Sequence, residues 1–494
     1  MSPVLLFCIL IGYFALLLGV AWATSRNATN DSFFIGNKSS NWMLVAFGMV
    51  GTTLSGATFI SVPGAVGRDG FGYGQILLGY VVGYIAVAYI LLPLYYRLQL
   101  TSIYTYLEVR LGKRAYQSGA GFFILSRLVG STARLYLVVN ILQAIILDRL
   151  GVPFWLTTVV ILGMILLYTY QGGVKTIVWT DTLQTSCMLF GLFACIGFLL
   201  SELNLSLGES LAQMQAQGLA RIFTTDFDSP NFFWKQFIAG IFIVMTMTGM
   251  DQEMMQKTIS VKTLRDSQKN LLSLTLVLVI VLSAFMFLGG LLYLYAPLAG
   301  VTATGDKIFS TVVMGHLPAA VQIIFLIALI SALFPSADGA ITALTSTFCI
   351  DLLGIQRRTD LSEQGKIKLR RRVHLGFAAL FLVLVMLFKL ADSPSMIVVI
   401  LKLASYTYGP LLGLFGFGML TSRTLNDRLV PFVTIGAPIL CAIIEFNQAH
   451  LLGSYRLGLE LLMVNGILVF AGLFLISKQK ISLPYATTRS PDVL

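Results

Sequence analysis

A polar, glycine-containing stretch interrupts the second apolar segment of the sequence. Residues 51–64 are Gly-Thr-Thr-Leu-Ser-Gly-Ala-Thr-Phe-Ile-Ser-Val-Pro-Gly, inside an apolar span of about 41 to 67. Glycine, proline and hydroxyl side chains weaken a helical hydrogen-bond ladder, and in hydrocarbon every freed amide or carbonyl needs a partner within the protein. A helix broken at this depth offers carbonyls to a cation and hydroxyls to a polar solute. The alternative is a kink relieved by close glycine packing or hydroxyl back-bonding.

Two aspartates lie in other apolar segments. Asp181 stands at the inner entrance of one span, and Asp338 lies in a span rich in small and hydroxyl residues, close to Ser336. Because an unpaired carboxylate in hydrocarbon costs a few kcal/mol, such acids are functional candidates by default. Carboxylate, hydroxyl and carbonyl oxygens suit alkali and alkaline-earth ions. We therefore expect a cation here, unless Asp181 forms a structural pair with Lys175 or caps nearby backbone.

The composition predicts a polytopic membrane protein. The chain is 57% hydrophobic and 11% charged, with a mean hydropathy of +0.85, whereas soluble domains have about 25% charged residues. The net charge of +11 comes from basic residues in short loops between apolar spans, so topology explains it better than a nucleic-acid partner. The five cysteines all fall in apolar segments without metal-ligand spacing, so we expect buried free thiols.

The apolar segments predict an all-α integral membrane fold with about thirteen spans. The first lacks a basic region before it, so we expect a retained span rather than a cleaved signal peptide. The spans cover approximately residues 2–24, 41–67, 72–96, 116–147, 153–170, 176–200, 232–250, 271–297, 317–350, 373–391, 395–420, 429–446 and 457–477. We expect one membrane transport domain, 1–494, in the plasma (inner) membrane.

The basic residues predict the orientation. With the N-terminus outside, 23 of the 33 lysines and arginines, Lys257 among them, fall in inside segments, six fall outside and four lie within spans. The positive-inside rule therefore predicts N-out and C-in. The inner loop from Gly354 to Arg372 carries seven basic residues and is expected to face anionic lipid.

The sequence resembles the sodium:solute symporter family, and the resemblance covers nearly the whole chain. It is carried by these residues: Gly172-Gly173 followed by Trp179-Thr180-Asp181 and Gln184, the polar ninth span ending in Asp351, and Gln252 with Gln256-Lys257-Thr258. The resemblance implies a leucine-transporter-like core of two inverted five-helix repeats. These would be residues 41–200 and 232–420, with peripheral spans at 2–24 and 429–477 and a cytoplasmic tail at 478–494.

The resemblance implies a main sodium site at the broken span. Its ligands would be the backbone carbonyls of Gly51, Leu54 and Ala332 and the hydroxyl of Ser336. Position 335, where the family offers a further hydroxyl, is Pro335, which has neither a hydroxyl nor an amide hydrogen, so this site loses a ligand.

A second cation site is also implied. Asp181 and the position of Asp338 match a second sodium site of some members, in which the latter position is normally serine. Two acids near one cation could strengthen that site or share a proton.

The resemblance points to the broken span for the solute as well. Thr53, Ser55 and Thr58 look like the solute-facing positions of sialic acid transporters, and Thr53 stands where the proline carriers have an acid. Further pocket candidates are Tyr73, Gln75, Thr246, Thr248, Asp251, Gln252 and Glu253. Of these we select Tyr73, Gln75 and Thr248 as substrate residues.

Two arginines in the fourth span are candidate solute anchors. Arg127 and Arg134 lie seven residues apart on one helical face. Sialic acid transporters hold the carboxylate with an arginine in this helix, but Gly130 falls at that position, one turn from each. The alternative is a pair of arginines that are salt-bridged within the bundle or that snorkel. For Asp251 and Glu253 we expect a cytoplasmic helix end.

Together these features predict a sodium-driven symporter of a small polar solute (a sugar, a sialic acid or another carboxylate-bearing solute) that works by alternating access. No catalysis, organic cofactor or nucleic-acid partner is implied, and the sequence leaves the oligomeric state, a monomer included, open. Two alternatives remain: proton coupling through Asp181 and Asp338, and a transport-derived membrane sensor or binding protein, motivated by Pro335.

Overall fold

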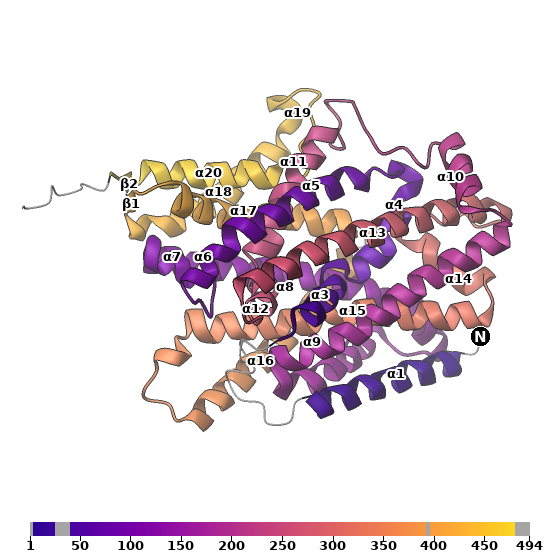
Figure 1. Cartoon of the computed structure of the whole chain (residues 1–494), viewed down its shortest axis with the longest axis horizontal. Coiled ribbons are helices and arrows are strands. Elements are labelled where there is room, and N and C mark those ends of the chain that lie inside the picture. Colours follow the sequence, from indigo (N-terminus) through magenta and orange to yellow (C-terminus); the bar gives the residue numbers. More distant parts are fainter. Residues whose placement is uncertain (1–2, 25–39, 392–395, 480–494) are drawn as a thin grey trace, which may run out of the picture.

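The structure, a computed structural model, describes residues 3–24, 40–391 and 396–479, and it is almost wholly helical (Figure 1). The helices of the first half are α1 Pro3–Thr24, α3 Trp42–Leu54, α4 Gly56–Asp69, α5 Tyr73–Ala86, α6 Leu92–Arg97, α7 Thr105–Arg110, α8 Lys113–Leu142, α9 Phe154–Leu203 and α10 Leu207–Ala216. Those of the second half are α11 Phe233–Val244, α12 Gln252–Thr258, α13 Leu264–Leu298, α14 Ile308–His316, α15 Ala319–Thr347, α16 Glu363–Ala391, α17 Met396–Leu420, α18 Val430–Phe446, α19 Gln448–Leu451 and α20 Leu461–Leu475.

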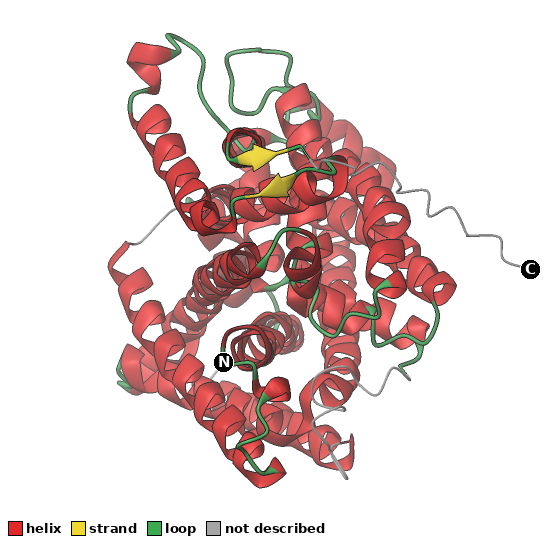
Figure 2. Ribbon diagram, turned by 90° about the vertical axis from the view of Figure 1, so that its left-hand side faces the viewer, coloured by secondary structure: helices red, strands yellow, loops and turns green. Residues whose placement is uncertain are grey.

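Long helices pack side by side, and a short strand pair lies at one end of the bundle (Figure 2). Strand β1, Thr424–Leu425, pairs antiparallel with β2, Ser477–Lys478. Helix α1 packs on α9 and α15, while α18 and α20 pack on each other and on α17, so both sets lie at the periphery (Figure 1). Cys8 on α1 is exposed and Cys187 on α9 is only partly buried, so the expectation that all five thiols are buried is wrong for these two residues.

The all-α membrane prediction agrees with the described residues. Nine of their helices are long and apolar enough to cross a membrane, and eleven if each of two bent pairs counts as one span. Two shorter apolar helices, Phe154–Leu167 and Leu461–Leu475, accompany them. The count of thirteen spans and the N-out orientation stay predictions.

The sequence predicts two spans where the structure has the single helix α9. Its 50 residues would make a straight rod of about 75 Å, more than twice the roughly 30 Å of bilayer hydrocarbon. Its apolar parts are Phe154–Leu167 and Thr176–Leu203. At 1.5 Å per residue these parts would be about 21 and 42 Å long, so each is closer to the thickness of a bilayer than the whole helix is.

Two spans are broken rather than straight. Helices α3 and α4 meet at Ser55 with a bend of 56°, and Ser55 has φ 19° and ψ 164°, which lies outside the helical region. The second break lies between Phe233–Gly249 and α12, with a bend of 68°. There the Asp251 side chain caps α12 by accepting from two backbone amides. The first break confirms the prediction made from residues 51–64.

Side chains from a neighbouring segment satisfy the backbone at the second break. The Tyr95 hydroxyl donates to the Gly249 carbonyl at 2.7 Å, and the Tyr104 hydroxyl donates to the Met250 carbonyl at 3.0 Å. The Gln252 side chain accepts from the Ile103 amide and donates to the Thr101 carbonyl, both at 3.0 Å. Polar groups freed at this break are therefore tied to the segment from α6 to α7.

Glycine permits the close crossing of α5 and α11. A Cβ on Gly79 would lie 2.1 Å from the Phe237 carbonyl oxygen, and a Cβ on Gly240 would lie 2.5 Å from the Ile76 carbonyl oxygen. Both neighbours are backbone atoms, so neither can rotate aside.

We therefore expect Gly79→Ala to lower the free energy of unfolding by about 1–3 kcal/mol, the usual cost of overpacking. Gly121→Ala is the control, because no heavy atom lies within 4 Å of the added Cβ and alanine favours helix. The measurement is thermal unfolding in detergent. Equal midpoints for the two variants would contradict the close crossing.

Candidate functional site

The break between α3 and α4 packs against the middle of α15. A Cβ on Gly51 would lie 3.7 Å from Pro335 Cγ, and a Cβ on Gly56 would lie 3.7 Å from the Ala332 carbonyl oxygen. Leu54, at the end of α3, lines the cavity beside the break. The structure therefore brings the two helices of the predicted main sodium site together.

Hydroxyl groups lie at this contact. The Ser336 hydroxyl donates to the Leu333 carbonyl of its own helix at 2.9 Å. On the other side, the buried Thr185 hydroxyl of α9 accepts from the Gly51 amide at 3.1 Å. Thr185 and Pro335 thus both lie beside Gly51. Sequence reasoning did not select Thr185.

A cavity of about 90 Å³ adjoins the break. Its wall also includes Tyr80, Tyr84 and aliphatic side chains of α11 and α17. Seven of the eight predicted substrate residues line it: Thr53, Ser55, Thr58, Tyr73, Arg127, Arg134 and Thr248.

The eighth, Gln75, lies elsewhere. Its amide donates to the Asn231 carbonyl at 3.2 Å and accepts from the Thr224 amide at 3.1 Å, so it fastens a loop. It lines a larger cavity of about 590 Å³, which shares Tyr73 and Leu401 with the smaller one. Gln75 therefore lines the larger cavity and not the smaller one.

Arg127 and Arg134, both on α8, differ in their partners. Arg127 is 4% exposed; its Nε donates to Glu253 Oε2 at 2.6 Å, its Nη2 donates to the same oxygen, and its Nη1 lies 3.6 Å from Asp251 Oδ2. Arg134 is half-buried and lines the cavity, and among the described residues it has no hydrogen bond or ion pair. The salt-bridged alternative therefore holds for Arg127 and not for Arg134.

Asp251 and Glu253 are not at an exposed helix end. They are 0% and 2% exposed, at the start of α12. Asp251 Oδ2 accepts from the Tyr408 hydroxyl at 2.7 Å, while Oδ1 accepts from the Glu253 and Met254 amides. The second break directs both acids towards Arg127, in the interior of the bundle.

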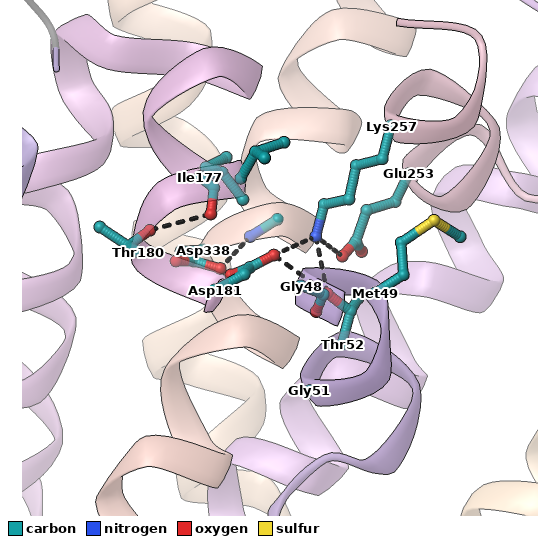
Figure 3. A network of polar contacts seen from close by, with 12 residues as sticks. Gly48, Met49, Gly51, Thr52, Ile177, Thr180, Asp181, Glu253, Lys257 and Asp338 are labelled. Atoms are coloured by element: carbon teal, nitrogen blue, oxygen red, sulfur yellow. Dashed lines mark hydrogen bonds and ion pairs between the residues drawn. The ribbon is translucent and has the colours of Figure 1, made fainter. Parts of the chain in front are cut away.

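Asp181 is paired with a lysine. The Lys257 ammonium donates to Asp181 Oδ2 at 2.8 Å and to the Thr52 hydroxyl at 2.8 Å, and Thr52 donates to the same carboxylate oxygen at 3.1 Å (Figure 3). The Lys175 side chain, the pairing predicted as an alternative, lies outside the described residues. Lys257 is 3% exposed, so counting it among the loop cations was wrong.

Asp338 belongs to the same cluster. Its side chain is drawn next to Asp181 in Figure 3. A Cβ on the adjacent Gly339 would lie 2.3 Å from Glu253 Oε1 and 3.2 Å from Lys257 Nζ, so α12 packs directly on α15 here. The two acids predicted to hold a second cation thus lie near a lysine ammonium.

Sequence reasoning did not select Thr52 and Lys257 for the site, and for Glu253 it preferred a cytoplasmic helix end to the pocket. One signal was available: three charged residues, Asp251, Glu253 and Lys257, follow a second polar interruption at Thr246-Met247-Thr248-Gly249. In a fold of inverted repeats, this stretch corresponds to the first broken span.

The curated relatives are sodium-coupled transporters. SiaT, the sodium/sialic acid symporter of Proteus mirabilis, is 24% identical over 84% of this chain and 85% of its own length. Sodium-coupled monocarboxylate transporter 1 of Mus musculus is 26% identical over 84% of this chain and 67% of its own. The sodium-dependent multivitamin transporter of Oryctolagus cuniculus is 25% identical over 79% of this chain, which spans only 62% of that protein.

Solved structures show the fold. A substrate-bound, outward-open, Na+-coupled sialic acid symporter, described as revealing a novel Na+ site, has a TM-score of 0.82 at 19% identity, covering 96% of this chain and 99% of that one. Mhp1, a nucleobase-cation-symport-1 transporter in a closed conformation, has a TM-score of 0.58 at 14% identity, covering 90% and 93%. Both neighbours have the leucine-transporter-like fold.

The family assignment rests on a match along most of the chain. The model described as the sodium:solute symporter family matches residues 33–427, which include both broken spans, the cavity and the buried charge cluster. The chain therefore belongs to the sodium:solute symporter family, and it is a membrane transporter rather than an enzyme.

Proposed function

We propose that this protein couples Na+ flow to uptake of a small carboxylate-bearing solute, and that Arg134 holds the carboxylate. The observation that carries the proposal is a guanidinium that lines the cavity without a hydrogen bond or ion pair among the described residues. A half-buried cation that faces a cavity without an anion is costly, so an anionic solute would supply the missing partner. A guanidinium also matches the planar geometry of a carboxylate.

The position of Arg134 on α8 supports this role. Long helical side chains point back towards the N-terminus and cover the preceding turn. Arg134 Nη1 lies 4.0 Å from the Cβ that a side chain at Gly130 would have. Arg134 therefore reaches the turn where sialic acid transporters have their arginine, and Gly130 leaves the space free.

The cavity favours a short solute. Its volume of about 90 Å³ is below the roughly 150 Å³ of an engineered cavity that binds benzene. The hydroxyls of Thr53, Ser55 and Thr58 lie near the break, while Ile243 and Val244 provide an apolar wall. A short carboxylate with a polar and an apolar side fits this lining better than a complete sialic acid.

For the coupling ion we propose the contact of the α3–α4 break with α15. Carbonyls of Gly51, Leu54 and Ala332 and the hydroxyl of Ser336 would bind Na+, and Thr185 would supply the hydroxyl that Pro335 lacks. The ion and the solute then share the same break, so each raises the affinity for the other by an equal factor.

We also propose the domain organisation, the orientation and the location of the protein. It comprises one transport domain with repeats at 41–200 and 232–420, has an N-out and C-in orientation, and lies in the plasma membrane. Proton coupling and a sensor role are not favoured, because the matched relatives are described as sodium-coupled transporters.

The test is thermal stability of the purified protein with short monocarboxylates, sialic acid and neutral sugars, each in Na+ and in K+. A ligand that binds only the folded state stabilises it by about 2.7 kcal/mol at a hundred times its Kd. We expect a short monocarboxylate to raise the unfolding temperature in Na+ and not in K+. Stabilisation by a neutral sugar, or equal stabilisation in K+, would contradict the proposal.

A further inference from the structure

The Lys257 ammonium lies where the sequence predicts a second sodium ion. Its Nζ donates to Asp181 Oδ2 and to Thr52 Oγ1, both at 2.8 Å, and lies 3.6 Å from Glu253 Oε1 (Figure 3). The three oxygens come from α9, α3 and α12, and the lysine side chain is 3% exposed. The ammonium therefore joins three helices at one buried point.

These contacts are those of a bound monovalent cation. Carboxylate and hydroxyl oxygens are hard ligands of the kind that alkali ions prefer. A lysine ammonium carries the same single positive charge as Na+ and donates up to three hydrogen bonds. We propose that Lys257 is a tethered cation that replaces Na+ between Asp181 and Asp338, so that the chain binds one Na+ rather than two.

The surrounding backbone is built closely around this point. A Cβ on Gly48 would lie 3.2 Å from Asp181 Cβ, and a Cβ on Gly339 would lie 3.2 Å from Lys257 Nζ. Glycines on α3 and α15 thus admit the ion pair between the helices. Loss of the ammonium would leave Asp181 and Glu253 buried with less compensating charge, and a cation from solution would offset that cost.

A tethered cation changes the charge moved per cycle. The inference rests on the proposed Na+ coupling but not on the choice of solute, because Lys257 does not line the cavity. If one Na+ accompanies one monocarboxylate, the loaded carrier moves no net charge from solution. Uptake would then depend on the Na+ gradient and not on the membrane potential.

The test counts Na+ bound per chain by equilibrium binding of radiolabelled Na+ to the full-length protein in nanodiscs, without solute. We expect one Na+ for the wild type and two for Lys257→Met, which is one atom shorter than lysine and removes its charge. Lys257→Met with Asp181→Asn should return the count to one, because the double variant removes both charges of the pair.

Two results would overturn the inference. One is a wild-type count of two, which decides the matter even where Lys257→Met does not fold. The other is a count of one for a folded Lys257→Met protein. Because the experiment contains no solute, the number of bound Na+ ions can be measured even if the solute is not a carboxylate. In that case carboxylates would fail to stabilise the protein in the thermal test of the proposed function.

Discussion

Arg134→Gln is expected to weaken binding of the carboxylate solute by about a hundredfold to a thousandfold while leaving the fold intact. Removing one partner of a desolvated, hydrogen-bonded charge pair typically costs 2–5 kcal/mol, and each 1.4 kcal/mol is tenfold in Kd. Arg134 has no hydrogen bond or ion pair among the described side chains. Its replacement therefore leaves none of these groups without a partner. The Kd of the solute is measured by titrating it in Na+ and recording the unfolding temperature at each concentration.

The control for Arg134 is Arg149→Gln, which removes the same charge from an exposed turn. It should leave solute affinity unchanged. Arg134→Lys should recover only part of the affinity, because an ammonium lacks the planar fork of the guanidinium. Unchanged affinity in Arg134→Gln would place the anion site elsewhere in the protein.

Arg127→Met is expected to lower the free energy of unfolding by about 3–5 kcal/mol, the usual cost of removing one partner of a buried ion pair. Among the described residues, Glu253 would then keep only the ion pair with Lys257, at 3.6 Å. The Asp251 carboxylate would lose less of its stabilisation, since Tyr408 and two backbone amides also donate hydrogen bonds to it. Denaturation of the purified protein, compared with that of the wild type, measures the loss.

The companion variant for Arg127 adds Glu253→Gln to Arg127→Met. Replacing both partners by neutral groups of similar size removes the stranded charge, so most of the lost stability should return. A double variant that is less stable than Arg127→Met alone would show that the pair contributes little and that Glu253 is held mainly by its other contacts.

Local signals explain what the sequence predicted well. The break at Ser55 was predictable because glycine, proline and hydroxyl residues disfavour a continuous helix wherever they stand together. The cavity residues Thr53, Ser55 and Thr58 followed from it, since the break sets which side chains face inwards. Gln75 was misplaced because its partners lie in a loop about 150 positions away along the chain.

Charge pairing could not be predicted in the same way. Lys257 and Asp181 are 76 residues apart and Arg127 and Glu253 are 126 apart, and no periodicity links such positions. A lysine near the end of an apolar segment resembles a loop anchor until the second bend is known. That bend turns α12 inwards and buries Lys257 with Glu253.

The two breaks of the fold differ in what meets their backbone. At the second, the hydroxyls of Tyr95 and Tyr104 donate to the carbonyls of Gly249 and Met250. Both breaks border the cavity, since Ser55 of the first and Thr248 of the second line it, but the carbonyls of the second are also bonded to another segment of the chain. Because these hydrogen bonds link the second break to α6 and to the start of α7, a change in its 68° bend would move that segment as well.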